Sequence, residues 1–180
     1  LAYGVRVRPE RIIILGNAGS GKSTLSRILG EMLNYPVTHL DRLFWRPGWL
    51  KPESEEFREK VTESVLDTVW INEGNYARRT FDLRLSRADL VIWLNTPRIT
   101  CLFRVLIRSF LNKSRTDLPD GCSEKINYEF LEFLRYVWRF DTRDRPEIER
   151  LRIKFGSDVP VIYLHNRKQI KSFLAGIHNK

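Results

Sequence analysis

Cysteine, methionine and long apolar runs are scarce in this sequence of 180 residues. It holds 2 Cys and 1 Met, and Cys101 and Cys122 form neither a CxxC pair nor a cluster with metal-ligand spacing. This excludes a disulfide-rich scaffold and favours two reduced thiols in a cytoplasmic protein. The most apolar helix candidate, residues 100–111, is interrupted by Arg104 and Arg108, so no segment predicts a membrane span. The first ten residues lack the apolar run of a secretory signal, although the chain begins with Leu1 and not with Met.

Acidic residues are the minority charge. The 31 Lys and Arg against 22 Asp and Glu give a net charge of +9 and a pI of about 9.8. A positive excess of this size indicates an anionic partner such as a phosphate, a nucleotide or a nucleic acid. Hydrophobic residues make up 42% and charged residues 29%, which is typical of a globular protein, and the length fits a single domain over residues 1–180.

Short apolar runs alternate with helical periodicity along the whole chain. Residues 11–15, an Arg followed by three Ile and a Leu, form an Ile-rich run, which predicts a strand buried on both faces. Similar runs predict strands near 37–40, 69–72, 90–94 and 159–164. Between them lie amphipathic stripes, which predict helices. This alternation predicts an α/β domain with a parallel sheet, in which ligands bind beyond the carboxyl ends of the strands.

The sequence of the last third of the chain predicts two helices separated by a charged loop. An aromatic helix is expected from about residue 124 to 140, followed by a charged loop over 139–145. Pro146 is expected to open the next helix, because proline is tolerated in a first helical turn and disfavoured further inside.

The segment after the first strand has the pattern GxxxxGKS, which is the phosphate-binding P-loop. Three glycines allow its backbone to wrap tightly, so that N–H groups and the start of the following helix face an anion. Lys22 would reach the β- and γ-phosphates of ATP, and the hydroxyl of Ser23 would ligate Mg²⁺. The predicted nucleotide-binding residues are Gly16, Asn17, Ala18, Gly19, Ser20, Gly21, Lys22, Ser23 and Thr24.

Further segments follow the P-loop in a distinctive order: HLD at 39–41, LFW at 43–45 with PGW at 47–49, EGNY at 73–76, LRL at 83–85 with AD at 88–89, and VWRF at 137–140. With them the chain from residue 11 onward resembles the DNA topology modulation proteins (FlaR-like), relatives of adenylate kinase. The resemblance implies a P-loop NTPase fold of the nucleoside-monophosphate-kinase type. It further implies a three-layer α/β/α architecture, a parallel sheet with the strand order 2-3-1-4-5, and a mobile lid around residues 104–145.

Two acids follow predicted strands near the P-loop. Asp41 would bind Mg²⁺ through water or accept a proton from a substrate hydroxyl, and its alternative is a helix or turn cap. By the resemblance, Glu73 takes the place of the acid that orders water around Mg²⁺ in adenylate kinases, with Glu here for Asp. Gly74 would let a ligand approach the backbone. No acidic residue ends the fourth predicted strand, because Leu94 is followed by Asn95. Metal ligands are therefore expected from Ser23 together with Asp41 or Glu73.

Arginines supply the remaining candidates. Arg78 or Arg79 would grip an acceptor phosphate by the resemblance, or form a solvated surface pair. Arg104 and Arg108 are four residues apart and so lie on one helix face. By the resemblance they are catalytic lid-base arginines, with Arg104 over the adenine ring and Arg108 on the phosphates; the alternative is a solvated basic face. The resemblance to nucleotide kinases implies further lid arginines at 139, 143 and 145, and Arg143 is the one favoured for catalysis.

Aromatic and imidazole side chains complete the set. Phe44, Trp45 and Trp49 would form a stacking wall for an acceptor, or would cover a helix end. His39 lies within a predicted strand and is interpreted as a structural histidine. His165 would line the adenine pocket together with Asn166 and Arg167.

Two functions are consistent with this pattern. The first is an ATP- and Mg²⁺-dependent phosphotransferase that acts on a nucleotide or another small phosphoacceptor. The second is a nucleic-acid-associated ATP switch, suggested by the net charge of +9 and by the family resemblance. No helix-turn-helix, zinc-finger or RNA-binding signature accompanies the charge.

Overall fold

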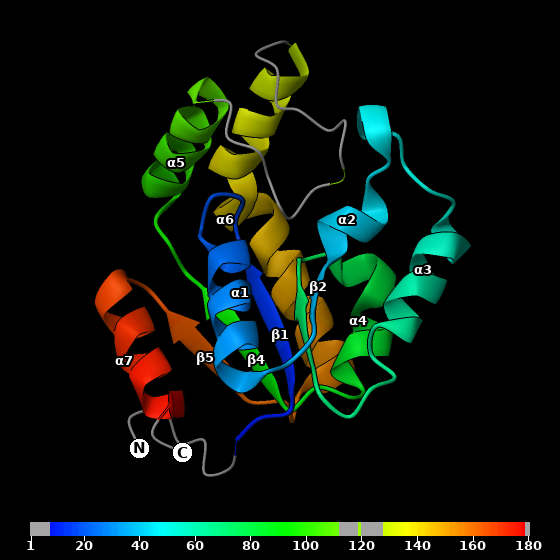
Figure 1. The fold of residues 1–180 in the computed structure, drawn as a ribbon. Helices are drawn as coiled ribbons and strands as arrows, with labels where there is room; N and C mark the ends of the chain where they lie inside the picture. The colour runs from blue at the N-terminus through cyan, green and yellow to red at the C-terminus, as the bar shows by residue number, and fades with distance from the viewer. Residues whose placement is uncertain (1–7, 112–118, 120–127, 179–180) are drawn as a thin grey trace.

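The predicted parallel sheet is present in the computed structural model, which describes residues 8–111, 119 and 128–178. Its strands all run parallel in the order β2-β3-β1-β4-β5, which confirms the fold class and the strand order expected from the sequence (Figure 1). The strands are β1 (Arg11–Gly16), β2 (Val37–His39), β3 (Trp70–Glu73), β4 (Leu90–Leu94) and β5 (Val161–Leu164).

Helices cover both faces of this sheet. Figure 1 shows α1 and α7 on one face and α4 and α6 on the other, which gives three layers. The helical elements are α1 (Lys22–Leu33), α2 (Leu40–Phe44), the 3-10 turn η1 (Pro47–Trp49), α3 (Ser54–Glu63), α4 (Ala77–Leu85), α5 (Arg98–Phe110), α6 (Tyr128–Gly156) and α7 (Arg167–His178).

The side chains of β1 divide between the two layers. Ile12 and Ile14 pack with residues of α1 and α7, whereas Ile13 and Leu15 pack with residues of α4 and α6. All four are 0% exposed. Successive residues of a strand point to opposite faces, so a strand covered on both sides needs an unbroken apolar run. Full burial of each such side chain stabilises the fold by about 2 kcal/mol relative to exposure.

The expectation of a charged loop over 139–145 is wrong, because α6 runs unbroken through this segment and carries Pro146 in its interior. Pro146 has no N–H to donate to the carbonyl of Thr142, which is the usual cost of an internal proline. The buried side chains of Phe140 and Ile148 pack on either side of it into the same core cluster. Tertiary packing therefore overrides the local signal for a helix boundary.

Two further clusters lie toward the carboxyl end of the sheet. One joins α2 and α3 through Leu40, Phe44, Phe57 and Val61. The other joins α5 and α6 through residues such as Val105 and Val137. Much of the expected lid, residues 112–118 and 120–127, lies outside the described residues, as does Cys122. In the part of the chain that the structure describes, no helix has the length and apolar character needed to cross a bilayer.

Candidate functional site

The P-loop connects β1 to α1 through three glycines in the left-handed or positive-φ region. Gly16, Gly19 and Gly21 have φ values of 145°, 77° and 103°. Gly21 is the N-cap of α1, no side chain caps this helix end, and its first turn contains no acidic residue. The N–H groups of the first turn are therefore directed at an open position where an anion is favoured. This is the geometry predicted from the GxxxxGKS pattern, and Lys22 and Ser23 begin the helix.

The tip of the P-loop is held between α5 and α6. The buried side chain of Asn17 donates from Nδ2 to the carbonyl of Val137 in α6 at 2.8 Å. A Cβ at Gly19 would lie 2.5 Å from the carbonyl oxygen of Cys101 in α5, so only glycine fits there. Asn17 Oδ1 and Ser20 Oγ are buried without a hydrogen-bond partner. Such groups are costly to leave unpaired, so the loop is suited to a polar ligand.

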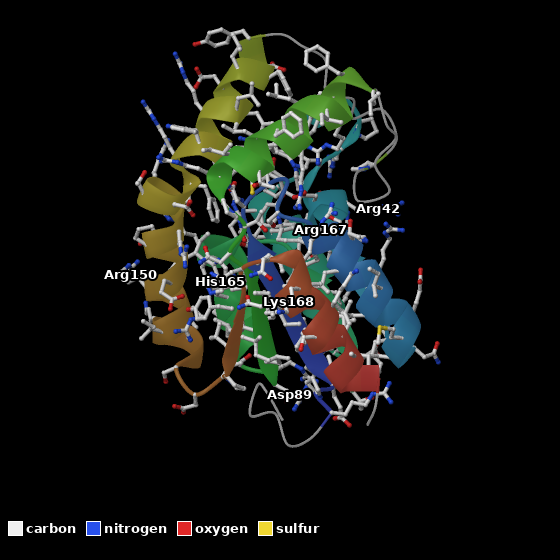
Figure 2. All side chains as sticks on the ribbon, turned by 90° about the vertical axis from the view of Figure 1, so that its left-hand side faces the viewer. Arg42, Asp89, Arg150, His165, Arg167 and Lys168 are labelled. Atoms are coloured by element: carbon white, nitrogen blue, oxygen red, sulfur yellow. The ribbon has the colours of Figure 1, made fainter. Side chains whose placement is uncertain are left out.

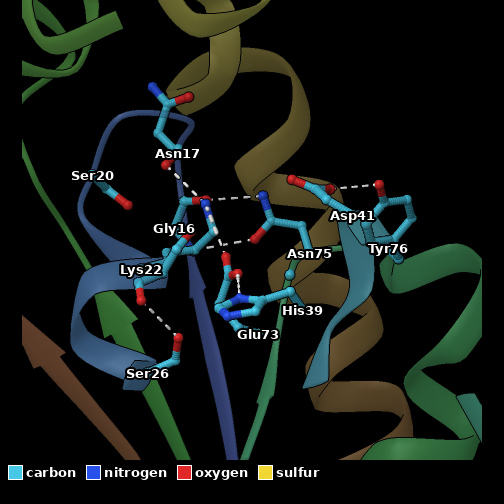
Figure 3. Close-up of polar contacts among 12 residues, drawn as sticks. Gly16, Asn17, Ser20, Lys22, Ser26, His39, Asp41, Glu73, Asn75 and Tyr76 are labelled. Carbon is cyan, nitrogen blue, oxygen red and sulfur yellow. Dashed lines mark hydrogen bonds and ion pairs between the residues drawn. The ribbon is translucent and has the colours of Figure 1, made fainter. Parts of the chain in front are cut away.

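Lys22 reaches across the loop toward β3. Its Nζ donates to the carbonyl of Asn17 at 3.1 Å and lies 3.7 Å from Oε1 of Glu73 (Figure 3). The other carboxylate oxygen of Glu73 contacts Nδ1 of His39 at 2.9 Å. The carboxylate is 2% exposed and is thus oriented from both sides. His39 lies in β2, within a strand as expected, and its ring contacts this carboxylate.

Asp41 lies in α2 on the other side of the 73–76 segment. It accepts a hydrogen bond of 2.6 Å from the hydroxyl of Tyr76, which itself has a left-handed φ of 33° (Figure 3). Burial, and then the charge of Asp41, raise the pKa of Tyr76 well above its usual value. The phenol therefore remains a donor to the carboxylate.

Trp45 is the C-cap of α2, and its ring contacts those of Phe44 and Trp49 edge-on, at ring-centroid distances of 4.9 and 5.3 Å.

Two residues that the sequence analysis did not assign connect these parts. Asn75 forms two hydrogen bonds with the backbone of Gly16, and the buried side chain of Arg84 donates to the carbonyls of Gly74 and Asn75. Burial lowers the pKa of Arg84 to about 9, and the nearby charge of Glu73 opposes this shift. The only sequence signal for either was its place in the EGNY and LRL segments.

The candidate arginines are not equally placed. Arg104 donates to the P-loop carbonyls of Gly19 and Ser20 at 3.3 and 3.1 Å, and Arg108 lies one turn further along α5. Arg78 is exposed and pairs with Glu147 of α6 at 3.3 Å. Arg143 is exposed on α6. The structure thus brings together the P-loop, Glu73 and Arg104, while Arg78 pairs with Glu147 and Arg143 is exposed.

A polar chain follows β4 and β5. Arg145 donates to Oδ1 of Asn95 at 2.6 Å, and Nδ2 of Asn95 lies 3.0 Å from Nδ1 of His165. Figure 2 shows His165 and Arg167 where β5 passes into α7. This places Arg145, rather than Arg143, at the carboxyl edge of the sheet.

The residues present fit Mg²⁺ bound together with a polyphosphate. Mg²⁺ binds proteins through one or two oxygen ligands and completes its shell with phosphate oxygens and water. Ser23 follows the P-loop lysine in the first turn of α1, and the oriented carboxylate of Glu73 faces the same lysine. In the ranges described, no three His, Cys, Asp or Glu side chains cluster as a metal site of their own.

Comparisons with known proteins agree with this fold. No curated protein matches the chain. Among solved structures, shikimate kinase from Bacteroides thetaiotaomicron is similar with a TM-score of 0.53 and 20% identity, over 95% of this chain and 97% of that one. A gluconokinase from Sinorhizobium meliloti 1021 gives a TM-score of 0.57 and 15% identity, over 97% and 94%. Shikimate kinase from Acinetobacter baumannii in complex with shikimate gives 0.55 and 17%, over 93% and 90%.

At these identities the likeness shows the fold alone, which is the kinase-like fold of P-loop NTPases. The sequence itself matches the family described as AAA domain over residues 12–110, more than half of the chain. This match covers the P-loop, the 73–76 segment and α5. The protein therefore belongs to the AAA domain family.

Proposed function

We propose that the protein is an ATP- and Mg²⁺-dependent phosphotransferase that acts on a small molecule. The observation that carries this proposal is the position of Lys22, whose ammonium lies between the P-loop carbonyl of Asn17 and the buried carboxylate of Glu73. A lysine in this position can follow the γ-phosphate, while the loop N–H groups hold the remaining phosphates. The likeness in fold to shikimate kinases and a gluconokinase supports a kinase.

Each part of the site would have a specific role in the proposed reaction. Ser23 and Glu73 would hold Mg²⁺, which neutralises phosphate charge when bound. Lys22 would stabilise negative charge on the transferred group, and Arg104 would keep the tip of the loop in place through its contacts with Gly19 and Ser20. His39 would keep Glu73 oriented toward the phosphates.

Asp41 is the candidate proton acceptor when the acceptor group is a hydroxyl. The proton would pass from that hydroxyl to the Asp41 carboxylate as the new O–P bond forms and the bond to the β-phosphate oxygen breaks, which releases ADP. The hydrogen bond from Tyr76 would orient the carboxylate. An acceptor that is itself a phosphate needs no such base, so the two acceptor classes differ in their dependence on Asp41.

The test is a panel of acceptors with ATP and Mg²⁺, comprising nucleosides, nucleoside monophosphates, and small alcohols and sugar acids. Products are identified by mass spectrometry, and nucleotide binding is measured in parallel by calorimetry. Phosphorylation of at least one class is expected, and it is expected to be strongly reduced in Lys22→Ala. ATP binding without transfer to any of them would contradict the proposal.

Association with nucleic acid is a separate prediction of the family resemblance. Several described arginines already pair with acids of the protein, for example Arg11 with Asp89 and Arg58 with Asp82, both at 2.7 Å. Such pairs engage these arginines within the fold but leave the net charge of +9 unchanged, because each pair joins one basic and one acidic residue. Titration with duplex DNA at low and at moderate salt tests this role, since phosphate contacts give a steep salt dependence.

A further inference from the structure

Strands β1 and β3 separate at the point where the P-loop begins. Their parallel register pairs Ile14 with Glu73, and the N–H of Gly74 still donates to the carbonyl of Ile14 at 3.1 Å. The next rung of a regular parallel ladder would run from the N–H of Gly16 to the carbonyl of Gly74. Both groups have other partners here, so the ladder ends and the two strands diverge.

The side chain of Asn75 replaces the missing rung. Its Oδ1 accepts from the N–H of Gly16 at 3.1 Å, and its Nδ2 donates to the carbonyl of the same residue at 3.0 Å (Figure 3). One carboxamide therefore fixes both polar groups of the first P-loop residue. These two groups would otherwise lie at the end of a strand without ladder partners, where an unpaired backbone group is costly.

Arg84 occupies the other half of the broken ladder. Its guanidinium donates to the carbonyl of Gly74 at 2.9 Å and to the carbonyl of Asn75 at 2.5 Å, while Nε donates to Oγ1 of Thr80 at 2.9 Å. The side chain is 0% exposed. A buried cation that bridges two successive carbonyls leaves the backbone of the 74–75 segment little freedom to shift.

The same segment also contacts the remaining parts of the proposed site. Glu73, just before it, faces Lys22, and Tyr76, just after it, donates to Asp41. The backbone is closely packed at both ends of this contact, because a Cβ at Gly74 would lie 3.0 Å from Cβ of Leu40 and one at Gly16 would lie 2.7 Å from the carbonyl oxygen of Leu94. The side chain of Asn75 therefore links the P-loop backbone to the segment that carries Glu73 and Tyr76.

We propose that Asn75 is a positioning residue that sets the start of the P-loop for nucleotide binding, with Arg84 holding Asn75 in place. This inference rests on the proposed function, because it assumes that the P-loop binds a nucleotide. It assigns roles to two side chains that touch neither phosphate nor acceptor in the proposed site. It predicts that the first P-loop residue loses its order when the carboxamide is removed.

The experiment compares Asn75→Ala, the nearly isosteric Asn75→Asp, and Asn72→Ala as a matched control. Asn72 is a buried amide in β3, three residues before Asn75, and its Nδ2 donates to Oγ of Ser64 at 3.2 Å rather than to the P-loop. For each variant we would measure the Kd for MgATP, the Tm, and the hydrogen exchange of the Gly16 amide in the free protein by NMR.

Asn75→Ala is expected to raise the Kd for MgATP about tenfold or more and to accelerate exchange at Gly16, since two hydrogen bonds to the loop are lost. Asn75→Asp keeps the side-chain volume, so it tests the inference even where Asn75→Ala does not fold. It is expected to raise the Kd further, because a carboxylate would face the carbonyl of Gly16. Asn72→Ala is expected to lower the Tm while leaving the Kd and the Gly16 exchange near wild type.

An unchanged Kd together with unchanged Gly16 exchange in the folded Asn75 variants would overturn the inference. A loss of affinity in Asn72→Ala as large as in Asn75→Ala would overturn it as well, because the effect would then follow stability alone. A wild-type protein that does not bind MgATP would contradict the proposed function instead, so the two failures can be told apart.

Discussion

The ammonium of Lys22 lies 3.7 Å from a carboxylate oxygen of Glu73, and this carboxylate is 2% exposed. The contact joins the P-loop to the end of β3 across the opening between β1 and β3. In the proposed reaction both side chains interact with the same phosphates. Lys22 would contact them directly, and Glu73 would act through the Mg²⁺ that it holds. The ion pair is thus an arrangement that a bound nucleotide would reorganise.

Glu73→Gln separates these two roles. Removing the negative charge frees Lys22 for phosphate, so ATP affinity measured in EDTA is expected to stay the same or to improve. The Mg²⁺ concentration needed for half-maximal turnover is expected to rise about tenfold or more, because one charged ligand is lost. Calorimetry without metal and an activity titration with Mg²⁺ check both statements. Equal loss of affinity with and without Mg²⁺ would contradict the role given to Glu73.

Asp41→Asn tests the proposed base. With a hydroxyl acceptor, kcat is expected to fall about 100-fold or more while the KM for ATP changes little, since general-base catalysis contributes about 10²–10⁴-fold. Tyr76→Phe removes only the hydrogen bond that orients Asp41, and a smaller loss, about tenfold, is expected. Steady-state kinetics with the acceptor found in the panel give the comparison. With a hydroxyl acceptor, a kcat that survives Asp41→Asn would contradict the assignment of Asp41 as the base.

Arg104→Ala removes two contacts with the carbonyls of Gly19 and Ser20. We expect the Kd for MgATP to rise about tenfold, because these charge-assisted bonds hold the tip of the loop. Arg98 of the same helix is a matched control, since its guanidinium lies 4.1 Å from the ring centre of Trp138 and contacts no phosphate-binding residue in the proposed site. If Arg98→Ala and Arg104→Ala weaken nucleotide binding equally, the assignment of Arg104 is wrong.

The thiol of Cys101 is expected to be inert. It is 0% exposed, and burial raises its pKa from 9.0 to about 11, so little thiolate exists at pH 8. Because the folded pKa is the higher one, the corresponding stability is fully present below pH 9 and is lost as the pH rises toward 11. Thiol titration of Cys122→Ser, native and in denaturant, checks the reactivity. Rapid labelling of the native variant at pH 8 would contradict the burial of Cys101.

The sheet and the P-loop could be predicted because their signals are local. An unbroken run over residues 11–15 indicates a strand covered on both faces, and GxxxxGKS fixes the type of loop that follows. Pro146 shows the limit of local rules. Its missing N–H predicted a helix start, but the burial of Phe140 and Ile148 in one core cluster keeps α6 continuous.

The same wrong expectation of a loop left the choice among Arg139, Arg143 and Arg145 without a structural basis. A loop over 139–145 gives no basis for choosing among its arginines, whereas a continuous helix fixes which side each one faces. Arg145 then contacts Asn95 beyond β4, and Arg143 faces solvent. Whether either acts in catalysis stays a prediction.

The role of Asn75 could not be derived from sequence spacing. Its partner Gly16 is 59 residues earlier in the chain, and the contact depends on where two strands diverge. Arg84 contacts carbonyl groups, which every residue carries, so no residue type in the sequence points to its partners. Interactions between a side chain and the backbone are visible only once the fold is known.

Lys22→Ala tests the central claim most directly. We expect the Kd for MgATP to rise about 10- to 100-fold and turnover to fall at least as far, because charge-assisted bonds to the phosphates are lost. Calorimetric titration with MgATP at fixed salt, on protein whose Tm shows it to be folded, is the measurement. A variant that binds and turns over MgATP as the wild type does would contradict the assignment of this loop as the phosphate-binding site.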